Sequence, residues 1–73
     1  MKKEKQYMLL RFGRKVRLER ERRSFSQEKL GQMAGVHRTY VGMIERGEKN
    51  ITLLNIEKIG SALDLSLKQL MDF

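Results

Sequence analysis

The feature that most constrains this fold is a glycine between two short amphipathic segments. Residues 27–46 are QEKLGQMAGVHRTYVGMIER, and apolar residues recur at helical spacing on both sides of Gly35. Gly35 suits the left-handed backbone that often ends a helix. Gly31 supplies a small residue where the second helix would cross the first. We therefore expect two short helices that cross closely about a tight turn, which is the spacing of a helix-turn-helix.

Helical periodicity extends over the rest of the chain. Leu9, Phe12 and Val16 recur at steps of three or four and predict core positions on a helix over about 6–23. Polar residues that can cap helices precede the later segments: Ser26, His37, Thr52 and Ser66, the last in a capping box with Gln69. The predicted apolar faces hold Leu30, Met33 and Ala34 in the second helix and Leu53, Ile56, Ile59 and Leu63 in the fourth. No segment shows the sustained alternation of apolar and polar residues that indicates a strand. The chain is therefore predicted to be all-α, a bundle of five short helices in one domain over 1–73.

Several classes of protein are excluded by composition. The 73 residues include no cysteine, so neither a disulfide nor a thiolate metal site is expected. No apolar run approaches the roughly 20 residues that span a bilayer, and no signal peptide is evident, so we expect a cytoplasmic protein. The residues show no nucleophile–base pair, no paired carboxylates and no metal-ligand spacing. The chain is therefore not expected to be an enzyme, to bind a cofactor or metal, or to hold a small-molecule ligand.

The net charge of +7 is concentrated at the N-terminal end. Residues 1–23 contain ten Lys or Arg against three Glu, and the remainder is balanced. Such a basic segment suits a polyanion, either nucleic acid or an anionic membrane surface. It also fits a solvated helix face that only aids solubility, or an adaptor that binds a protein or membrane through the first helix. Residues 1–6 form a basic leader that either follows flanking phosphates or frays.

The outward face of the second segment favours DNA among these alternatives. On a helical wheel Val41 and Ile44 face inward, whereas Gly42 and Met43 face outward with Thr39 and Arg46. An exposed helical glycine costs about 1 kcal/mol relative to alanine. Insertion into a major groove would explain both unusual residues, since glycine allows close approach and methionine can contact a thymine methyl. The leading turn would then place its side chains against base edges, with an arginine suited to guanine O6 and N7.

A longer stretch of the sequence resembles a known family. SQEKLGQMAGVHRTYVGMIERGEKNITLLNIEKIGSALDLSLKQL is similar to the lambda-repressor-like helix-turn-helix domain, the XRE family, and the likeness extends from Phe12 to about Leu70. Within that family, HRTYVGMIERGEKNITL is most similar to the controller proteins of restriction–modification systems. The chain departs from the family pattern in having Gly31 where alanine is usual and Ser24 where glycine is usual.

The resemblance implies a role for particular residues. Gln27 would both contact a phosphate and brace the recognition helix, and an arginine of the first helix would pair with a glutamate of the third, here Arg20 and Glu45. The residues implied to contact bases are Arg38, Thr39, Tyr40, Met43 and Arg46. Those implied to bind phosphates are Gln27, His37, Lys49, Asn50 and Thr52.

The surplus of apolar residues near the C-terminal end indicates either a dimer seam or a cover for the core. These residues are Leu54, Leu65, Leu67, Met71 and Phe73. The seam is favoured because helix-turn-helix proteins usually bind two half-sites about one helical turn apart. The expected partners are a palindromic double-stranded DNA operator, a second copy of the chain and RNA polymerase.

The expected function is transcriptional regulation. The resemblance implies a controller that first activates and then represses its own gene and an endonuclease gene. The alternatives are a phage-type or antitoxin-like autorepressor of the same fold and, less favoured, the basic adaptor.

Overall fold

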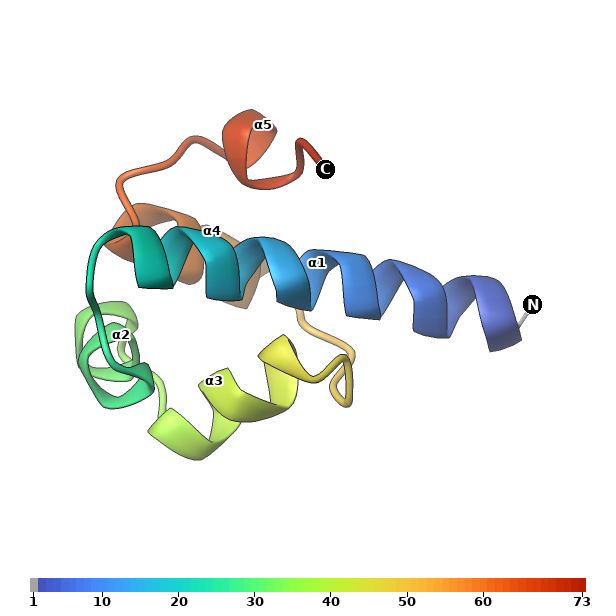
Figure 1. Cartoon of the computed structure of the whole chain (residues 1–73), viewed down its shortest axis with the longest axis horizontal. Coiled ribbons are helices and arrows are strands. Elements are labelled where there is room, and N and C mark those ends of the chain that lie inside the picture. Colours follow the sequence, from blue (N-terminus) through green and yellow to red (C-terminus); the bar gives the residue numbers. More distant parts are fainter. Residues whose placement is uncertain (1) are drawn as a thin grey trace.

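The part of the chain that the computed structural model describes contains five helices (Figure 1). It comprises the backbone of residues 2–73 and the side chains of residues 7–73. The helices are α1 (Lys2–Arg22), α2 (Gln27–Ala34), α3 (Arg38–Glu45), α4 (Leu53–Ala62) and α5 (Leu67–Leu70). The prediction of an all-α chain of five helices is confirmed. The expected start of the first helix near residue 6 is wrong, because α1 begins at Lys2; the contacts predicted for the leader's side chains lie outside the described residues.

Local sequence signals place the helix ends where expected. The side chains of Ser26, Thr52 and Ser66 each accept a hydrogen bond from a backbone N–H in the first turn of the helix that follows. The predicted capping box between Ser66 and Gln69 is complete. Gly35 ends α2 with φ of 74°. These features depend on residues only two to four positions apart, which is why the sequence predicts them.

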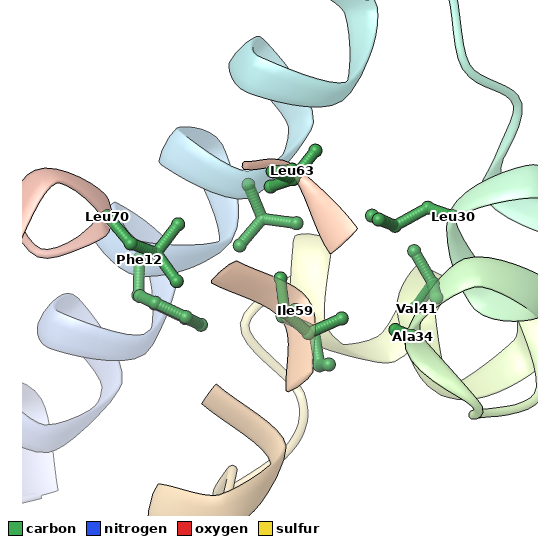
Figure 2. Packing of buried hydrophobic residues seen from close by; sticks show 9 residues of the cluster. Phe12, Leu30, Ala34, Val41, Ile59, Leu63 and Leu70 are labelled. Atoms are coloured by element: carbon green, nitrogen blue, oxygen red, sulfur yellow. The ribbon is translucent and has the colours of Figure 1, made fainter. Parts of the chain in front are cut away.

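All five helices contribute to one buried core (Figure 2). Its members are Phe12, Val16, Leu30, Ala34, Val41, Ile44, Ile59, Leu63 and Leu70. Three residues predicted for apolar faces lie elsewhere: Leu9 is half-buried, and Met33 and Leu53 are exposed. The core therefore excludes the first residue of α4, which is 70% exposed.

α1 closely approaches α3, which lies beneath the long helix in this view, while the N-terminal half of α1 projects beyond the bundle (Figure 1). A Cβ built on Gly13 would lie 2.3 Å from the Ile44 carbonyl oxygen and 2.6 Å from that of Glu45. Any larger residue would have to push the two backbones apart. Gly13 thus fixes the distance between α1 and the end of α3.

Ser24, which stands where the family has glycine, takes the backbone conformation that suits glycine. Its φ is 56°, in the left-handed region that costs an L-residue energy. It follows α1, and its N–H donates to the Glu21 carbonyl at 3.0 Å. The turn from α1 to α2 therefore places a serine in a conformation that glycine adopts without this cost. None of the described helices is long and apolar enough to cross a membrane.

Candidate nucleic-acid interface

The turn between α2 and α3 brings the two helices into close contact. The Val36 N–H donates to the Gly31 carbonyl at 2.9 Å, which closes the turn around Gly35. A Cβ on Gly31 would lie 2.7 Å from the Val36 carbonyl oxygen and 3.2 Å from the Arg38 nitrogen. The expectation that a small residue is needed at this crossing is confirmed. The same contact explains glycine here where alanine is usual, because even a methyl group would crowd the start of α3.

His37 caps the recognition helix α3, as predicted. Its Nδ1 accepts a hydrogen bond from the Thr39 N–H at 3.0 Å. With Nδ1 accepting, the neutral ring carries its proton on Nε2, which remains able to donate. The side chain is exposed at the leading end of the helix. This geometry is compatible with the predicted phosphate contact and leaves that contact a prediction.

Two of the residues implied to contact bases project from the first turn of α3. Arg38 and Thr39 are exposed, and the Arg38 side chain has 65% of its surface accessible. Its Nη1 lies 3.4 Å from Oε2 of Glu28, an ion pair open to solvent. Exposed pairs of this kind contribute about 0–1 kcal/mol, so Arg38 can leave Glu28 at little cost. The arginine is therefore available to a stronger acceptor.

The second half of the outward face differs from the wheel prediction. Gly42 is buried rather than exposed: a Cβ there would lie 3.1 Å from Arg46 Nη1 and 3.4 Å from Gln27 Oε1. Glycine is thus explained by the side chains that cover it, and the interpretation that it allows close approach of DNA is wrong for this structure.

The two other residues of this half of the face differ in exposure. Met43 is half-buried, and Arg46 is exposed with its Nε 3.0 Å from Glu48 Oε2. The hydrogen bond to Glu48 raises the pKa of Arg46, which stays a cation.

Tyr40 is bound to the protein more firmly than a free base-contacting side chain would be. It is half-buried, and its ring packs against the core. Its hydroxyl accepts a hydrogen bond from Asn55 Nδ2 at 2.9 Å. The residue therefore joins the first turn of α3 to α4, a contact that sequence spacing alone did not predict.

The far end of α3 is fixed by a buried ionic network. Arg20 donates two hydrogen bonds to Glu45, from Nε at 2.7 Å and from Nη2 at 3.0 Å, which confirms the predicted ion pair. A third donor, Nε2 of Gln27, binds the same carboxylate at 3.1 Å. The bracing role expected of Gln27 is confirmed, whereas its phosphate contact stays a prediction. The network ties α1, α2 and α3 together at one carboxylate.

The remaining phosphate candidates lie in the segment that joins α3 to α4. Lys49, Asn50 and Thr52 are all exposed. Thr52 Oγ1 accepts from the Asn55 N–H at 3.1 Å, so its own proton is left for another acceptor. A flexible cation, an amide and a hydroxyl in one exposed segment can all donate to phosphate oxygens.

Several cations of the N-terminal third form ion pairs with carboxylates of α1. Glu19 is buried, with ion pairs to Lys15 at 3.0 Å, Arg22 at 3.1 Å and Arg23 at 2.8 Å. The hydrogen bond from Arg23 is the main cause that lowers the pKa of Glu19. This cluster was not singled out from the sequence, although its spacing of three and four residues was visible. These ion pairs leave the basic surplus of the first third in place, because three cations share the one Glu19 carboxylate.

The predicted seam residues divide into two groups. Leu54, Leu67 and Met71 are exposed, with 70% of the Leu54 surface accessible. Leu65 and Phe73 are half-buried and pack against the core of their own chain. Arg11 donates to the Phe73 carbonyl at 2.7 Å. Thus two of the five residues act at least partly as a cover for the core, and three remain as candidate seam residues.

Comparison with known proteins agrees with this geometry. The helix-turn-helix family model matches residues 16–70. Control protein C.BamHI of Bacillus amyloliquefaciens is 52% identical over 65 residues, which is 88% of this chain and 80% of that protein. Control protein C.MunI of a Mycoplasma species is 39% identical over 62 residues, 84% of each.

A solved structure gives the same result. The crystal structure of the restriction–modification controller protein C.AhdI from Aeromonas hydrophila superposes with a TM-score of 0.83 and 42% identity. The superposition covers 85% of this chain and 94% of that one. The likeness therefore includes both the sequence and the arrangement of the helices.

Proposed function

The chain belongs to the helix-turn-helix family, and within it to the control proteins of restriction–modification systems, which are DNA-binding transcriptional regulators; from this premise we propose how it binds its operator. In the proposal, a single domain over residues 1–73 forms a homodimer, and each copy places α3 in one major-groove half-site of a palindrome. Two such half-sites lie about one helical turn apart in dimers of this class. The protein would act in the cytoplasm of its bacterial host.

The observation that carries the proposal is the exposed first turn of α3 on a helix whose other end is fixed. Arg38 and Thr39 project from this turn, and the buried Glu45 network holds the helix in place. A rigid helix with exposed donors at its leading end is suited to base edges. The proposed base contacts are made by Arg38, Thr39, Tyr40, Met43 and Arg46.

Phosphate contacts complete the proposed interface. The donors are Gln27, His37, Lys49, Asn50 and Thr52, which flank α3 on both sides in the sequence. Contacts of this kind fix register and orientation without carrying sequence information. Gln27 would contribute while its amide also braces Glu45.

The exposed apolar residues support the proposal of a homodimer. Leu54, Leu67 and Met71 would form its seam, with Leu65 and Phe73 at the edge of it. Regulation would follow from operator occupancy: a first dimer activates the chain's own gene and an endonuclease gene, and a second dimer represses them. Activation would require a contact with RNA polymerase.

Two variants test which of the proposed residues contact bases and which contact phosphates. The probes are a duplex that carries the sequence upstream of this gene and a scrambled duplex of equal length. Arg38→Ala should weaken specific binding by about 1–3 kcal/mol and relax one operator position. Lys49→Ala should weaken binding to both duplexes and reduce the slope of log affinity against log salt by about 1. Fluorescence anisotropy at several salt concentrations measures both effects. If Arg38→Ala leaves the sequence preference unchanged, the assignment of the base contact is wrong.

A further inference from the structure

A half-buried hydrogen bond joins the recognition helix to α4. Asn55 Nδ2 donates to the Tyr40 hydroxyl at 2.9 Å, and both residues are half-buried. Asn55 is itself held at the start of α4, because its backbone N–H donates to Thr52 Oγ1 at 3.1 Å. The amide therefore projects from a capped helix end toward the phenol.

This bond lies at the end of α3 that the ionic network does not hold. Within the described side chains, Glu45 makes its contacts with α1 and α2 from the last position of α3. At the leading end, the ion pair of Arg38 with Glu28 is exposed and 3.4 Å long. The Tyr40–Asn55 contact is thus the half-buried polar link between the first turn of α3 and another helix in this part of the chain.

The direction of the hydrogen bond leaves a donor free. A phenol has one proton and can also accept. Because the Tyr40 oxygen accepts from Asn55, its own proton is not needed for this bond, and no described side chain or carbonyl accepts it. An acceptor outside the protein, such as a DNA oxygen, can take that proton.

We propose that Asn55 is a positioning residue for DNA recognition. By holding the Tyr40 hydroxyl, it fixes the first turn of α3 relative to the start of α4, where Asn50 and Thr52 are the proposed phosphate donors. Phosphate contacts set the register in which the base-contacting side chains meet the groove. The Asn55 link therefore transmits that register to Arg38 and Thr39. The inference rests on the proposed function and extends it to a residue outside the proposed base and phosphate contacts.

The expected consequence is a loss of discrimination rather than a general loss of affinity. Without the link the first turn can shift, so the correct base sequence gains less over an incorrect one. Binding to a scrambled duplex depends mainly on phosphate charge and should change little. The ratio of specific to non-specific affinity should fall by about 2- to 10-fold, the effect of one neutral hydrogen bond.

Two variants and a double variant test this link. Asn55→Leu replaces the amide by an apolar branch with the same number of heavy atoms, and Tyr40→Phe removes only the hydroxyl. Each should reduce the ratio of affinities for the upstream and scrambled duplexes. Since both changes break the same bond, the double variant should lose no more than the larger single effect, and a double-mutant cycle measures this non-additivity.

A matched control distinguishes an effect on the position of α3 from a general loss of stability. Val16→Ala removes buried methyl groups from α1, at a residue outside both the proposed DNA contacts and the proposed dimer seam. It should lower the midpoint of thermal unfolding without changing the affinity ratio. If Asn55→Leu and Tyr40→Phe lower the midpoint but leave the ratio unchanged, the bond is only structural and the inference is overturned. If the unaltered chain does not discriminate between the duplexes, the proposed function fails along with the inference.

Discussion

Replacing Glu45 by glutamine should remove much of the stability of this small domain. The Glu45 side chain is 4% exposed and that of Arg20 is 12% exposed, so the pair is shielded from water. The hydrogen bond that Arg20 donates to Glu45 is the main cause that raises the pKa of Arg20. Arg20 stays charged in the variant because a guanidinium is effectively always protonated in proteins. Removing one partner of a buried pair typically costs about 3–5 kcal/mol, because the other charge is left without compensation.

The expected cost is about 3 kcal/mol, at the lower end of that range. Arg20 keeps one hydrogen bond in the variant, from Nη1 to the Phe25 carbonyl at 2.8 Å. A domain of this length has about 4–11 kcal/mol of total stability, so about a quarter or more of it would be lost. The midpoint of thermal unfolding should fall by about 12–24 °C.

Urea unfolding followed by far-UV circular dichroism measures the change for Glu45→Gln. Protein concentration is held fixed, since any dimer makes the apparent stability depend on it. Glu21→Gln is the matched control, because the Arg17–Glu21 pair is 3.2 Å long but its side chains are 64% and 53% exposed. That control should cost less than about 1 kcal/mol. If the two variants lose equal stability, burial does not govern the value of these pairs and the reasoning is refuted.

Three further predictions concern the turn from α1 to α2, the stability of the domain at acid pH and the dissociation of the proposed dimer. Ser24→Gly should raise the free energy of unfolding by about 1 kcal/mol, because φ at this position is 56°; a loss in urea unfolding would contradict this. Glu19 has a lowered pKa in the folded state, so its stabilising contribution is present above its ordinary pKa of 4.5 and is lost as the pH falls through the lower folded value. Stability should therefore vary less with pH below 4.5 in Glu19→Gln than in the unaltered chain, as measured by urea midpoints across the acid range. Leu54→Glu should raise the dimer dissociation constant at least about tenfold by placing a charge in an apolar seam, as measured by sedimentation equilibrium. Leu53→Glu, at an equally exposed neighbour, should change it less.

The sequence predicted local features well because they depend on near neighbours. Helix caps such as His37 and Thr52 and the turn at Gly35 follow from residue types within a few positions. The ion pair of Arg20 with Glu45 spans 25 positions and was found through the resemblance to a family. Periodicity alone would not have paired these two residues.

Contacts between distant segments account for the differences between the structure and what the sequence predicted. The wheel placed Gly42 on the outward face, but Gln27 from another helix covers it. Nothing in the sequence indicated that the Tyr40 hydroxyl would accept a hydrogen bond from Asn55 of α4. A helical wheel describes one helix and contains no information on which neighbours pack around it. The same limit explains why Leu53 was placed on the apolar face of the fourth helix although its side chain is exposed.

Selection of bound sequences from random duplex DNA tests the central claim most directly. The account predicts enrichment of one palindrome, with two identical half-sites about one helical turn apart, bound by two copies of the chain. The same selection with Arg38→Ala should give a palindrome that has lost preference at one position in each half-site. Recovery of sequences with no common motif, or of a single half-site bound by one copy, would contradict the account.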